Sequence, residues 1–225
     1  MTTALLQTTY FGPVQWYQKL YRYDHCLIEQ HDSYQKQTFR NRCIIATANG
    51  LQALTVPTVS SGCSVSGGET AGAEKCLLKD VRISDHNQWR RIHWNALQSA
   101  YSESPFFDYY ADDIRPFFER KYDFLIDFNE AIRQKMCELL DIHPHVEYTA
   151  SYLHSPLSAH SAPLASDQSA ITDFREVISA KHPQPDTDFE PKRYWQVFQQ
   201  KHGFLPNLSI LDLLFCMGPE GIFYL

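Results

Sequence analysis

Short segments in which apolar and polar residues alternate, or which are wholly apolar, predict several β-strands along the chain. Two of them flank the dipeptide Asn49-Gly50, which is typical of a tight β-hairpin turn, and Pro57 ends the second. The predicted strands are residues 5–10, 26–29, 42–48, 51–56, 77–83 and 146–152. The best-defined local structure is therefore an antiparallel hairpin over residues 42–56.

Apolar residues spaced three and four positions apart predict three helices, over residues 14–23, 86–101 and 122–141. The predicted buried face of the second helix consists of Trp89, Ile92, His93, Ala96, Leu97, Ala100 and Tyr101. Together the strands and helices favour the α/β class. We expect a single domain with a mixed β-sheet that contains the antiparallel hairpin and is flanked by amphipathic helices.

Two segments are poor in large apolar residues. Residues 60–75 are rich in Gly and Ser, and residues 154–170 are rich in Ser, Ala and Pro. The loss of conformational entropy on ordering such a segment exceeds the free energy that it gains by burying its few apolar side chains. Both are predicted to be flexible loops of one domain that spans residues 1–225. The Gly-rich loop also lacks the Lys-Ser/Thr ending of a phosphate-binding loop.

The composition excludes several classes of protein. The 225 residues carry a formal net charge of −6, which argues against a broad nucleic-acid surface. No apolar run is long enough to cross a bilayer, and the first residues lack the basic leader of a signal peptide. The six cysteines include no C-x-x-C pair, so neither a zinc ribbon nor a disulfide framework is indicated. These features predict a soluble, cytoplasmic protein.

The motifs of several large enzyme classes are missing, among them G-x-S-x-G, G-x-x-x-x-G-K-[ST] and H-E-x-x-H. His93 is the most informative histidine, because it lies within an apolar helix face. A neutral imidazole there either satisfies itself with one buried partner or lines a site as an acid or base. His86 lies seven residues earlier, too far for the usual i, i+4 pairing of metal ligands. The sequence predicts no metal site and indicates no cofactor.

Three basic residues of this net-acidic chain lie within seven positions, at Lys36, Arg40 and Arg42. They are either solvated charges on the outer face of a strand or part of a local anion site. Arginine supplies a planar fork of donors, lysine a compact charge, and the intervening Asn41 both a donor and an acceptor. A phosphorylated or carboxylated small molecule would suit such a site.

Six segments resemble the WbqC-like protein family, and their order along the chain strengthens the resemblance. They are YFGPVQWY (10–17), YQKQTFRNRCI (34–44), NGLQALTVPT (49–58), ISDHNQWRRIHWNALQSAYSESPFF (83–107), YDFLIDFNEAI (122–132) and NLSILDLLFCMGPEGIFYL (207–225). The resemblance covers nearly the whole chain. The family is known from bacterial gene clusters for O-antigen and other surface polysaccharides. The resemblance implies a cytoplasmic protein that acts on an activated sugar or on a related acyl or aminoacyl intermediate.

The resemblance also implies roles for polar residues in these segments, namely Tyr10, Pro13, Gln15, Lys36, Asn41, Arg42, Trp89, His93, Tyr101 and Asp212. We expect a transferase that acts on an amino-sugar or nucleotide-sugar-linked substrate. In this hypothesis Arg42 and Lys36 bind the anionic part, and Asn41 orients it. His93 is the general base for an attacking amine or hydroxyl and shares one hollow with Arg42. Tyr10, Gln15, Trp89 and Tyr101 complete the predicted substrate-binding site.

Two other functions stay open at this point. An aromatic segment could form the partner surface of a non-catalytic binding or assembly protein, which could be a homo-oligomer. Its rings are Phe106, Phe107, Tyr109, Tyr110, Phe117 and Phe118. Alternatively, a metal-dependent hydrolase could be built on His143, His145, His154 and His160. These histidines are not accompanied by carboxylates at ligand spacing, so the pattern is weak.

Overall fold

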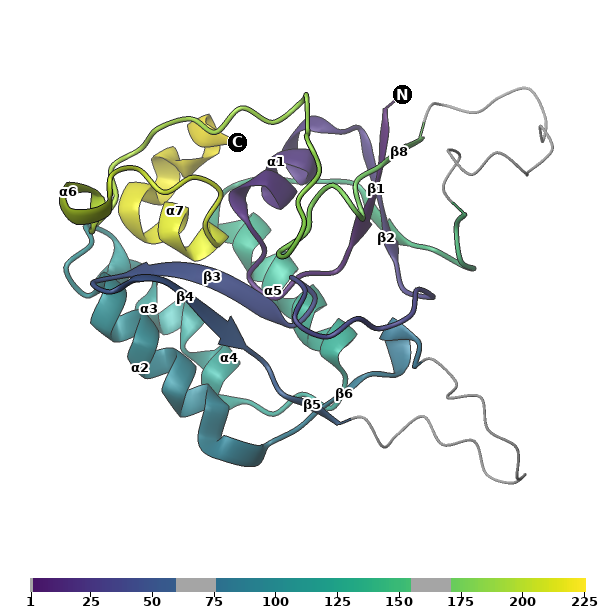
Figure 1. Cartoon of the computed structure of the whole chain (residues 1–225), viewed down its shortest axis with the longest axis horizontal. Coiled ribbons are helices and arrows are strands. Elements are labelled where there is room, and N and C mark those ends of the chain that lie inside the picture. The colour runs from purple at the N-terminus through teal and green to yellow at the C-terminus, as the bar shows by residue number, and fades with distance from the viewer. Residues whose placement is uncertain (1, 60–75, 155–170) are drawn as a thin grey trace.

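The computed structural model describes residues 2–59, 76–154 and 171–225, and it contains a four-stranded β-sheet (Figure 1). The strands lie in the order β7-β2-β1-β8, and each neighbouring pair is parallel. Their bounds are Thr3–Gln7 for β1, His25–Glu29 for β2, Val146–Tyr148 for β7 and Ile171–Asp173 for β8. Because all four run the same way, their carboxyl ends meet at one edge of the sheet.

Helix α1 (Val14–Arg22) leads from β1 to β2 and agrees with the helix predicted over residues 14–23. The chain turns tightly before it. A Cβ atom on Gly12 would lie 2.3 Å from the side-chain oxygen of Thr9, so only glycine fits there without a shift. The turn therefore places the start of α1 directly beside the carboxyl end of β1.

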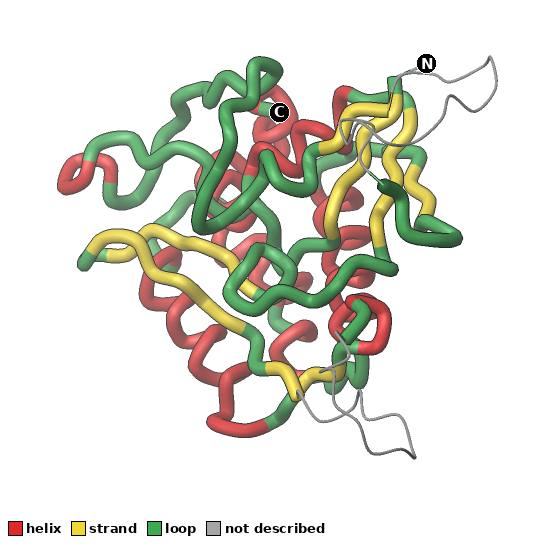
Figure 2. The backbone as a smooth tube through the Cα atoms, turned by 45° about the vertical axis from the view of Figure 1, so that its right-hand side comes forward, coloured by secondary structure: helices red, strands yellow, loops and turns green. Residues whose placement is uncertain are grey.

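Strands β3 (Arg42–Thr47) and β4 (Gly50–Thr55) form the predicted antiparallel hairpin. Gly50 has a φ of 105°, a conformation that favours glycine. The hairpin lies apart from the parallel sheet, between α2 (Trp89–Tyr101) and α7 (Ile210–Met217) (Figures 1 and 2). The α/β class, the hairpin and the flanking helices are confirmed. The parallel strands and the hairpin form separate sheets, so the hairpin does not belong to the four-stranded sheet.

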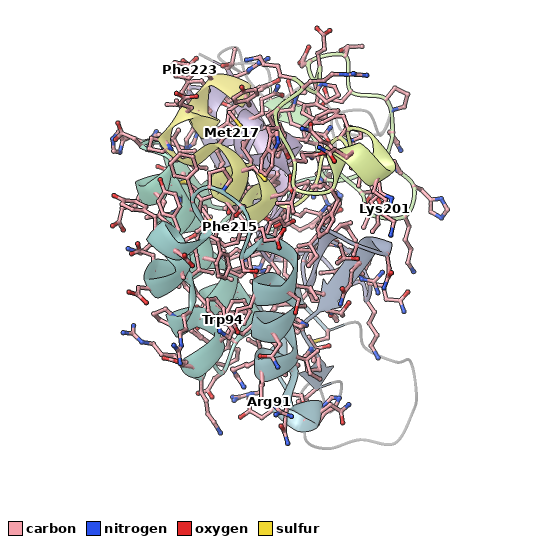
Figure 3. All side chains as sticks on the ribbon, turned by 90° about the vertical axis from the view of Figure 1, so that its left-hand side faces the viewer. Arg91, Trp94, Lys201, Phe215, Met217 and Phe223 are labelled. Atoms are coloured by element: carbon pink, nitrogen blue, oxygen red, sulfur yellow. The ribbon has the colours of Figure 1, made fainter. Side chains whose placement is uncertain are left out.

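Four helices between residues 89 and 139 pack through aromatic side chains. They are α2, α3 (Phe107–Ile114), α4 (Pro116–Glu119) and α5 (Leu125–Leu139). The ring centres of Trp94 and Phe107 are 5.9 Å apart, and those of Phe107 and Phe215 are 5.0 Å apart (Figure 3). These contacts join α2, α3 and α7 in one core.

This packing overturns the prediction of an aromatic partner surface. Of the six rings in that segment, Phe107, Tyr110, Phe117 and Phe118 are buried and Phe106 is half-buried. Tyr109 is the one that is strongly exposed, at 73%. The helical spacing turns the other rings inward, where they contribute to the core that joins the four helices.

Several predicted boundaries differ from the structure. Residues 77–83 are not one strand, because the backbone amides of Leu78 and Lys79 donate to carbonyls that follow β2. They form a 3-10 turn (Leu78–Asp80) and the short strand β6 (Arg82–Ile83), which pairs with β5 (Thr58–Val59). Ile92, predicted to be buried, is 52% exposed. The two predicted loops lie outside the described residues, apart from His154.

The end of the chain is part of the core. After the short helix α6 (Gln199–His202), seven of the eight residues of α7 are buried. A 3-10 turn (Gly218–Tyr224) follows, and the carbonyl of Leu225 accepts a hydrogen bond from Arg22 of α1 at 3.1 Å. None of the described helices combines the length and apolar character needed to cross a membrane.

Candidate functional site

The predicted general base, His93, lies buried between two parts of the chain. Its Nδ1 is 2.8 Å from the hydroxyl of Tyr10, and the ring also bonds the backbone of Thr55. Burial lowers the pKa of His93 to about 4, so the imidazole is neutral at pH 7. A neutral ring that donates to the Thr55 carbonyl accepts from Tyr10 through Nδ1. Both ring nitrogens therefore have partners within the protein.

Arg42 approaches the same place from the hairpin. Its Nε donates to the side-chain oxygen of Thr55 at 3.0 Å. Thr55 and His93 line a surface hollow of about 200 Å³, together with Trp89 and Ile92. His93 and Trp89 thus line one hollow, with Tyr10 behind His93, whereas Arg42 bonds the Thr55 side chain and is not among the residues that line the hollow.

The other predicted site residues lie elsewhere. Lys36 is exposed in a turn before β3, and the side-chain amide of Asn41 donates to the Val56 carbonyl at 2.9 Å. Gln15 bonds Asp186 at 2.7 Å, next to the buried Lys19. Tyr101 donates to the buried carboxylate of Asp212 at 2.9 Å. The eight residues predicted to form the catalytic and substrate-binding site therefore lie in several places and do not form one site.

Removing the Tyr10 hydroxyl tests the internal role of His93. Tyr10→Phe should lower the free energy of unfolding by about 1–2 kcal/mol, because it leaves a buried ring nitrogen without its donor. Urea unfolding would measure the change. Tyr109→Phe, at an exposed ring, is the control and should have no measurable effect. Equal effects of the two substitutions would contradict this interpretation.

A second polar region lies at the carboxyl edge of the parallel sheet, where binding sites of open α/β sheets commonly form. Five ionisable side chains meet there, and we call them the carboxyl-edge cluster. They are Glu29 at the end of β2, Asp32 and Arg40 in the segment that follows, and Asp173 and Arg175 at the end of β8. Asp32 is 18% exposed and Asp173 13% exposed, so solvent reaches the cluster.

Glu29 is the anchor of the cluster and is completely buried. One carboxylate oxygen accepts from the His31 amide at 2.7 Å and from the Thr149 hydroxyl at 2.8 Å. The other accepts from the Leu153 amide at 2.9 Å and lies 3.6 Å from Nη1 of Arg175. These contacts fix the carboxylate in one orientation and bring together segments about 120 residues apart in the sequence.

The two arginines of the cluster are nearly buried, at 3% and 6% side-chain exposure for Arg40 and Arg175. Arg175 binds Asp173 through two nitrogens, with Nη2 to Oδ2 at 2.7 Å, and Arg40 pairs with Asp32. Nη1 of Arg175 and Nε of Arg40 nevertheless have no hydrogen-bond partner among the described residues. Buried guanidinium donors are normally satisfied, so two buried donors without a hydrogen-bond partner single out this cluster.

The charges of the cluster influence one another. Burial lowers the pKa of Arg40, Asp32 opposes that effect, and Arg175 is close enough to add to it. Tyr152, 40% exposed, lies over the guanidinium of Arg175, with 5.1 Å to the ring centre. The cluster thus presents two partly exposed carboxylates and an aromatic ring to solvent, whereas the unpaired guanidinium donors are buried within it.

Most residues of this cluster were not among the predicted site residues. Arg40 was noted only as one of three neighbouring basic residues, and Arg42 was preferred as the predicted ligand-binding arginine. The available signal was a charged residue at the end of a short apolar strand, as in Cys26-Leu27-Ile28-Glu29. That pattern becomes informative once strands are known to be parallel, because only then do their carboxyl ends meet.

Comparisons with known proteins agree with the resemblance described above. The chain is 27% identical over 233 residues to the "Uncharacterized protein Rv1507c" of Mycobacterium tuberculosis (strain ATCC 25618 / H37Rv), covering 99% of this chain and 96% of that protein. No solved structure matches the chain. The model of the WbqC-like protein family matches residues 7–224, which include the hairpin, the His93 region and the carboxyl-edge cluster. This chain therefore belongs to the WbqC-like protein family.

Proposed function

We propose that this protein is a transferase of bacterial surface-polysaccharide biosynthesis that acts in the cytoplasm on an amino-sugar or nucleotide-sugar-linked substrate. The carboxyl-edge cluster binds the sugar part. The observation that carries this proposal is the pair of buried guanidinium N–H groups, on Arg40 and Arg175, that lack a partner among the described residues. Membership of the WbqC-like family supports the polysaccharide context.

The charge of the cluster favours an amino sugar over a free phosphate. Three carboxylates against two guanidiniums leave a formal charge of −1 (−3 + 2). An amino group donates to the carboxylates, whereas sugar hydroxyls accept from the unused guanidinium N–H groups. A sugar ring can also pack its apolar face against the exposed Tyr152. An anionic leaving group, such as a nucleotide, then extends away from the cluster.

The hydrogen bonds of His93 conflict with its predicted role as general base. Its Nδ1 is occupied by the Tyr10 hydroxyl at 2.8 Å. A substrate proton could reach it only after this contact or the one to Thr55 breaks. Asp32 of the cluster has no such requirement, because it is partly exposed and each of its oxygens accepts one hydrogen bond from the protein. We therefore assign proton transfer from the attacking amine or hydroxyl to the cluster.

Calorimetric titration tests the proposal with four ligands: a 2-amino sugar, its N-acetyl form, a nucleotide-linked amino sugar and inorganic phosphate. The amino forms should bind, and N-acetylation or phosphate alone should weaken or abolish binding. Arg40→Lys and Arg175→Lys keep the charge but lose the planar fork, and each should weaken binding about tenfold or more. Arg115→Lys, at an exposed pair with Glu119, should leave binding unchanged.

Two outcomes would contradict the proposal. One is that none of the amino sugars binds to the unaltered protein at millimolar concentration. The other is that Arg175→Lys and Arg115→Lys bind equally well. Thermal unfolding without ligand identifies any lysine variant that is simply less folded.

A further inference from the structure

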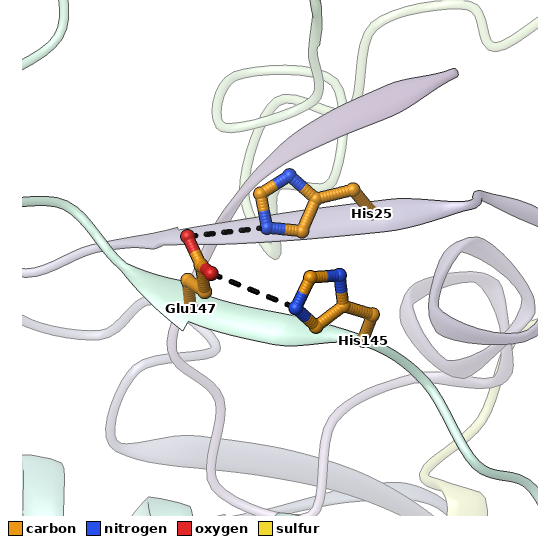
Figure 4. Close-up of side chains that lie close together, drawn as sticks. All are labelled: His25, His145 and Glu147. Atoms are coloured by element: carbon orange, nitrogen blue, oxygen red, sulfur yellow. Dashed lines mark ion pairs between the residues drawn. The ribbon is translucent and has the colours of Figure 1, made fainter. Parts of the chain in front are cut away.

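Three potential metal ligands converge at the amino edge of the parallel sheet. They are His25, the first residue of β2, and His145 and Glu147 at the start of β7 (Figure 4). Nε2 of His25 is 3.4 Å from one Glu147 oxygen, and Nε2 of His145 is 3.5 Å from the other. All three ligand atoms lie within 4.8 Å of one another.

The pairing of the strands produces this arrangement. Leu27 lies opposite Glu147, and the Cys26 amide donates to the His145 carbonyl at 2.8 Å. Alternate residues of a strand project from the same face, so His145 and Glu147 share a face. On β2, His25 projects from the same face of the sheet as these two residues. Cys26, the next residue of the strand, points into the core. The three side chains are therefore held together by the backbone of the sheet.

The distances suit a tetrahedral ion. Zinc binds histidine nitrogen at about 2.0–2.1 Å and carboxylate oxygen at about 2.0–2.2 Å, which places neighbouring ligand atoms roughly 3.3–3.5 Å apart in a tetrahedron. The two histidine-to-glutamate distances fall in this range, each to a different oxygen of Glu147, so the exposed carboxylate binds the ion after a small rotation or through both oxygens. His25 contributes a buried Nε2 that has no hydrogen-bond partner among the described residues. His145 and Glu147 are about 60% exposed, so water can take a fourth position.

We propose that His25, His145 and Glu147 form a zinc site that fastens the edge strand β7 to β2. Two imidazoles and one carboxylate favour zinc or a similar transition metal over Mg²⁺ and Ca²⁺, which prefer oxygen ligands. From the sequence, His145 was grouped with His143, His154 and His160, and His25 was not considered. The ligands of the proposed site have the period of a strand, and the third lies 120 residues away in the sequence.

The site lies at the opposite edge of the sheet from the carboxyl-edge cluster. His25 and Glu29 are the two ends of β2, about 13 Å apart at the usual rise of a strand. The ion therefore does not contact the proposed substrate. It holds β7, and the residue after β7, Thr149, donates to Glu29. Zinc thus stabilises the sheet, and this inference stands or falls independently of the proposed transferase activity.

Metal titration of chelator-treated protein without a histidine tag tests the site. Zn²⁺ should bind with a stoichiometry of one per chain and raise the melting temperature, and Mg²⁺ at the same concentration should not. Co²⁺ should give the visible absorption of a tetrahedral ion. Glu147→Gln, which keeps the size of an exposed side chain, and His145→Ala should each weaken Zn²⁺ binding at least about tenfold.

His143→Ala is the matched control, because His143 is 84% exposed and lies just before the site without contributing to it. It should bind Zn²⁺ as the unaltered protein does. The proposal is overturned if Zn²⁺ does not bind, if several ions bind weakly per chain, or if His143→Ala loses as much affinity as His145→Ala. A stability that responds to pH but not to Zn²⁺ would mean that the three residues form only an ion pair.

Discussion

Arg175→Ala is expected to lower the free energy of unfolding by about 3–5 kcal/mol, because it leaves buried carboxylates without their cation. Asp173 loses the hydrogen bonds from Nε and Nη2 of Arg175, and the completely buried Glu29 loses its ion pair with the guanidinium. Urea unfolding at pH 7 would measure the change. The loss should exceed that of any exposed ion pair in the described parts of the chain.

Arg115→Ala provides the comparison, since Arg115 also pairs with a carboxylate but is 58% exposed. It should cost about 0.5 kcal/mol or less. A double variant, Arg175→Met with Glu29→Gln, should recover part of the loss, because the unpaired buried charge is then removed. Similar losses for Arg175→Ala and Arg115→Ala would show that the cluster is not desolvated in solution.

Asp212→Asn is expected to change how the stability of the protein depends on pH. Burial raises the pKa of Asp212 to about 6, although Tyr194, Tyr101 and Gln196 donate to its carboxylate. In the unfolded chain an aspartate titrates near 3.8. Between these two values the folded state binds more protons than the unfolded state, so stability falls as pH rises. Above pH 6 both states are ionised, and this contribution is absent.

The expected size is about 2 kcal/mol between pH 7 and pH 4, approaching about 3 kcal/mol below the unfolded pKa. It appears as a change in the stability difference between the unaltered protein and Asp212→Asn, measured by urea unfolding at several pH values. The stability difference between the two proteins is needed because the titration of His93 changes the stability of both with pH, in the direction opposite to that of Asp212. The lowered pKa of His93, about 4, makes stability rise with pH over an overlapping range.

Leu213→Val is a suitable control, because it alters the same buried helix without removing a titratable group. Its stability difference from the unaltered protein should be constant between pH 4 and pH 7. A constant difference for Asp212→Asn as well would mean that Asp212 titrates alike in the folded and unfolded states. The network of Tyr101, Tyr194 and Gln196 would then solvate its charge fully.

Local patterns were sufficient for the elements whose causes are local. Asn49-Gly50 indicated the hairpin, although the turn residues are Ala48 and Asn49, and Gly50 pairs with Thr47 as the first residue of β4. Gly50 has a positive φ, which glycine adopts at no steric cost. Helix α5 was also predicted from a local pattern, because the residues on its buried face recur about every 3.6 positions. The strand predicted at residues 77–83 failed because distant carbonyls near Gln30 and Asp32 determine its backbone hydrogen bonds.

The basic segment illustrates what local patterns leave open. Lys36, Arg40 and Arg42 are close in sequence, yet Lys36 is exposed, Arg40 is buried against Asp32, and Arg42 bonds Thr55 of the hairpin. Arg40 lies in a turn before β3 begins, so the alternation of a strand does not govern its direction. Its surroundings depend on Arg175, which lies 135 residues later in the sequence.

The sequence by itself determined the α/β class, the hairpin, the main helices and, through motifs spread along the chain, membership of the WbqC-like family. Only the tertiary structure decided which polar residues meet. The carboxyl-edge cluster and the His25, His145 and Glu147 triad both depend on the order and register of parallel strands. That pairing joins segments more than 100 residues apart, and no local spacing of residue types encodes it.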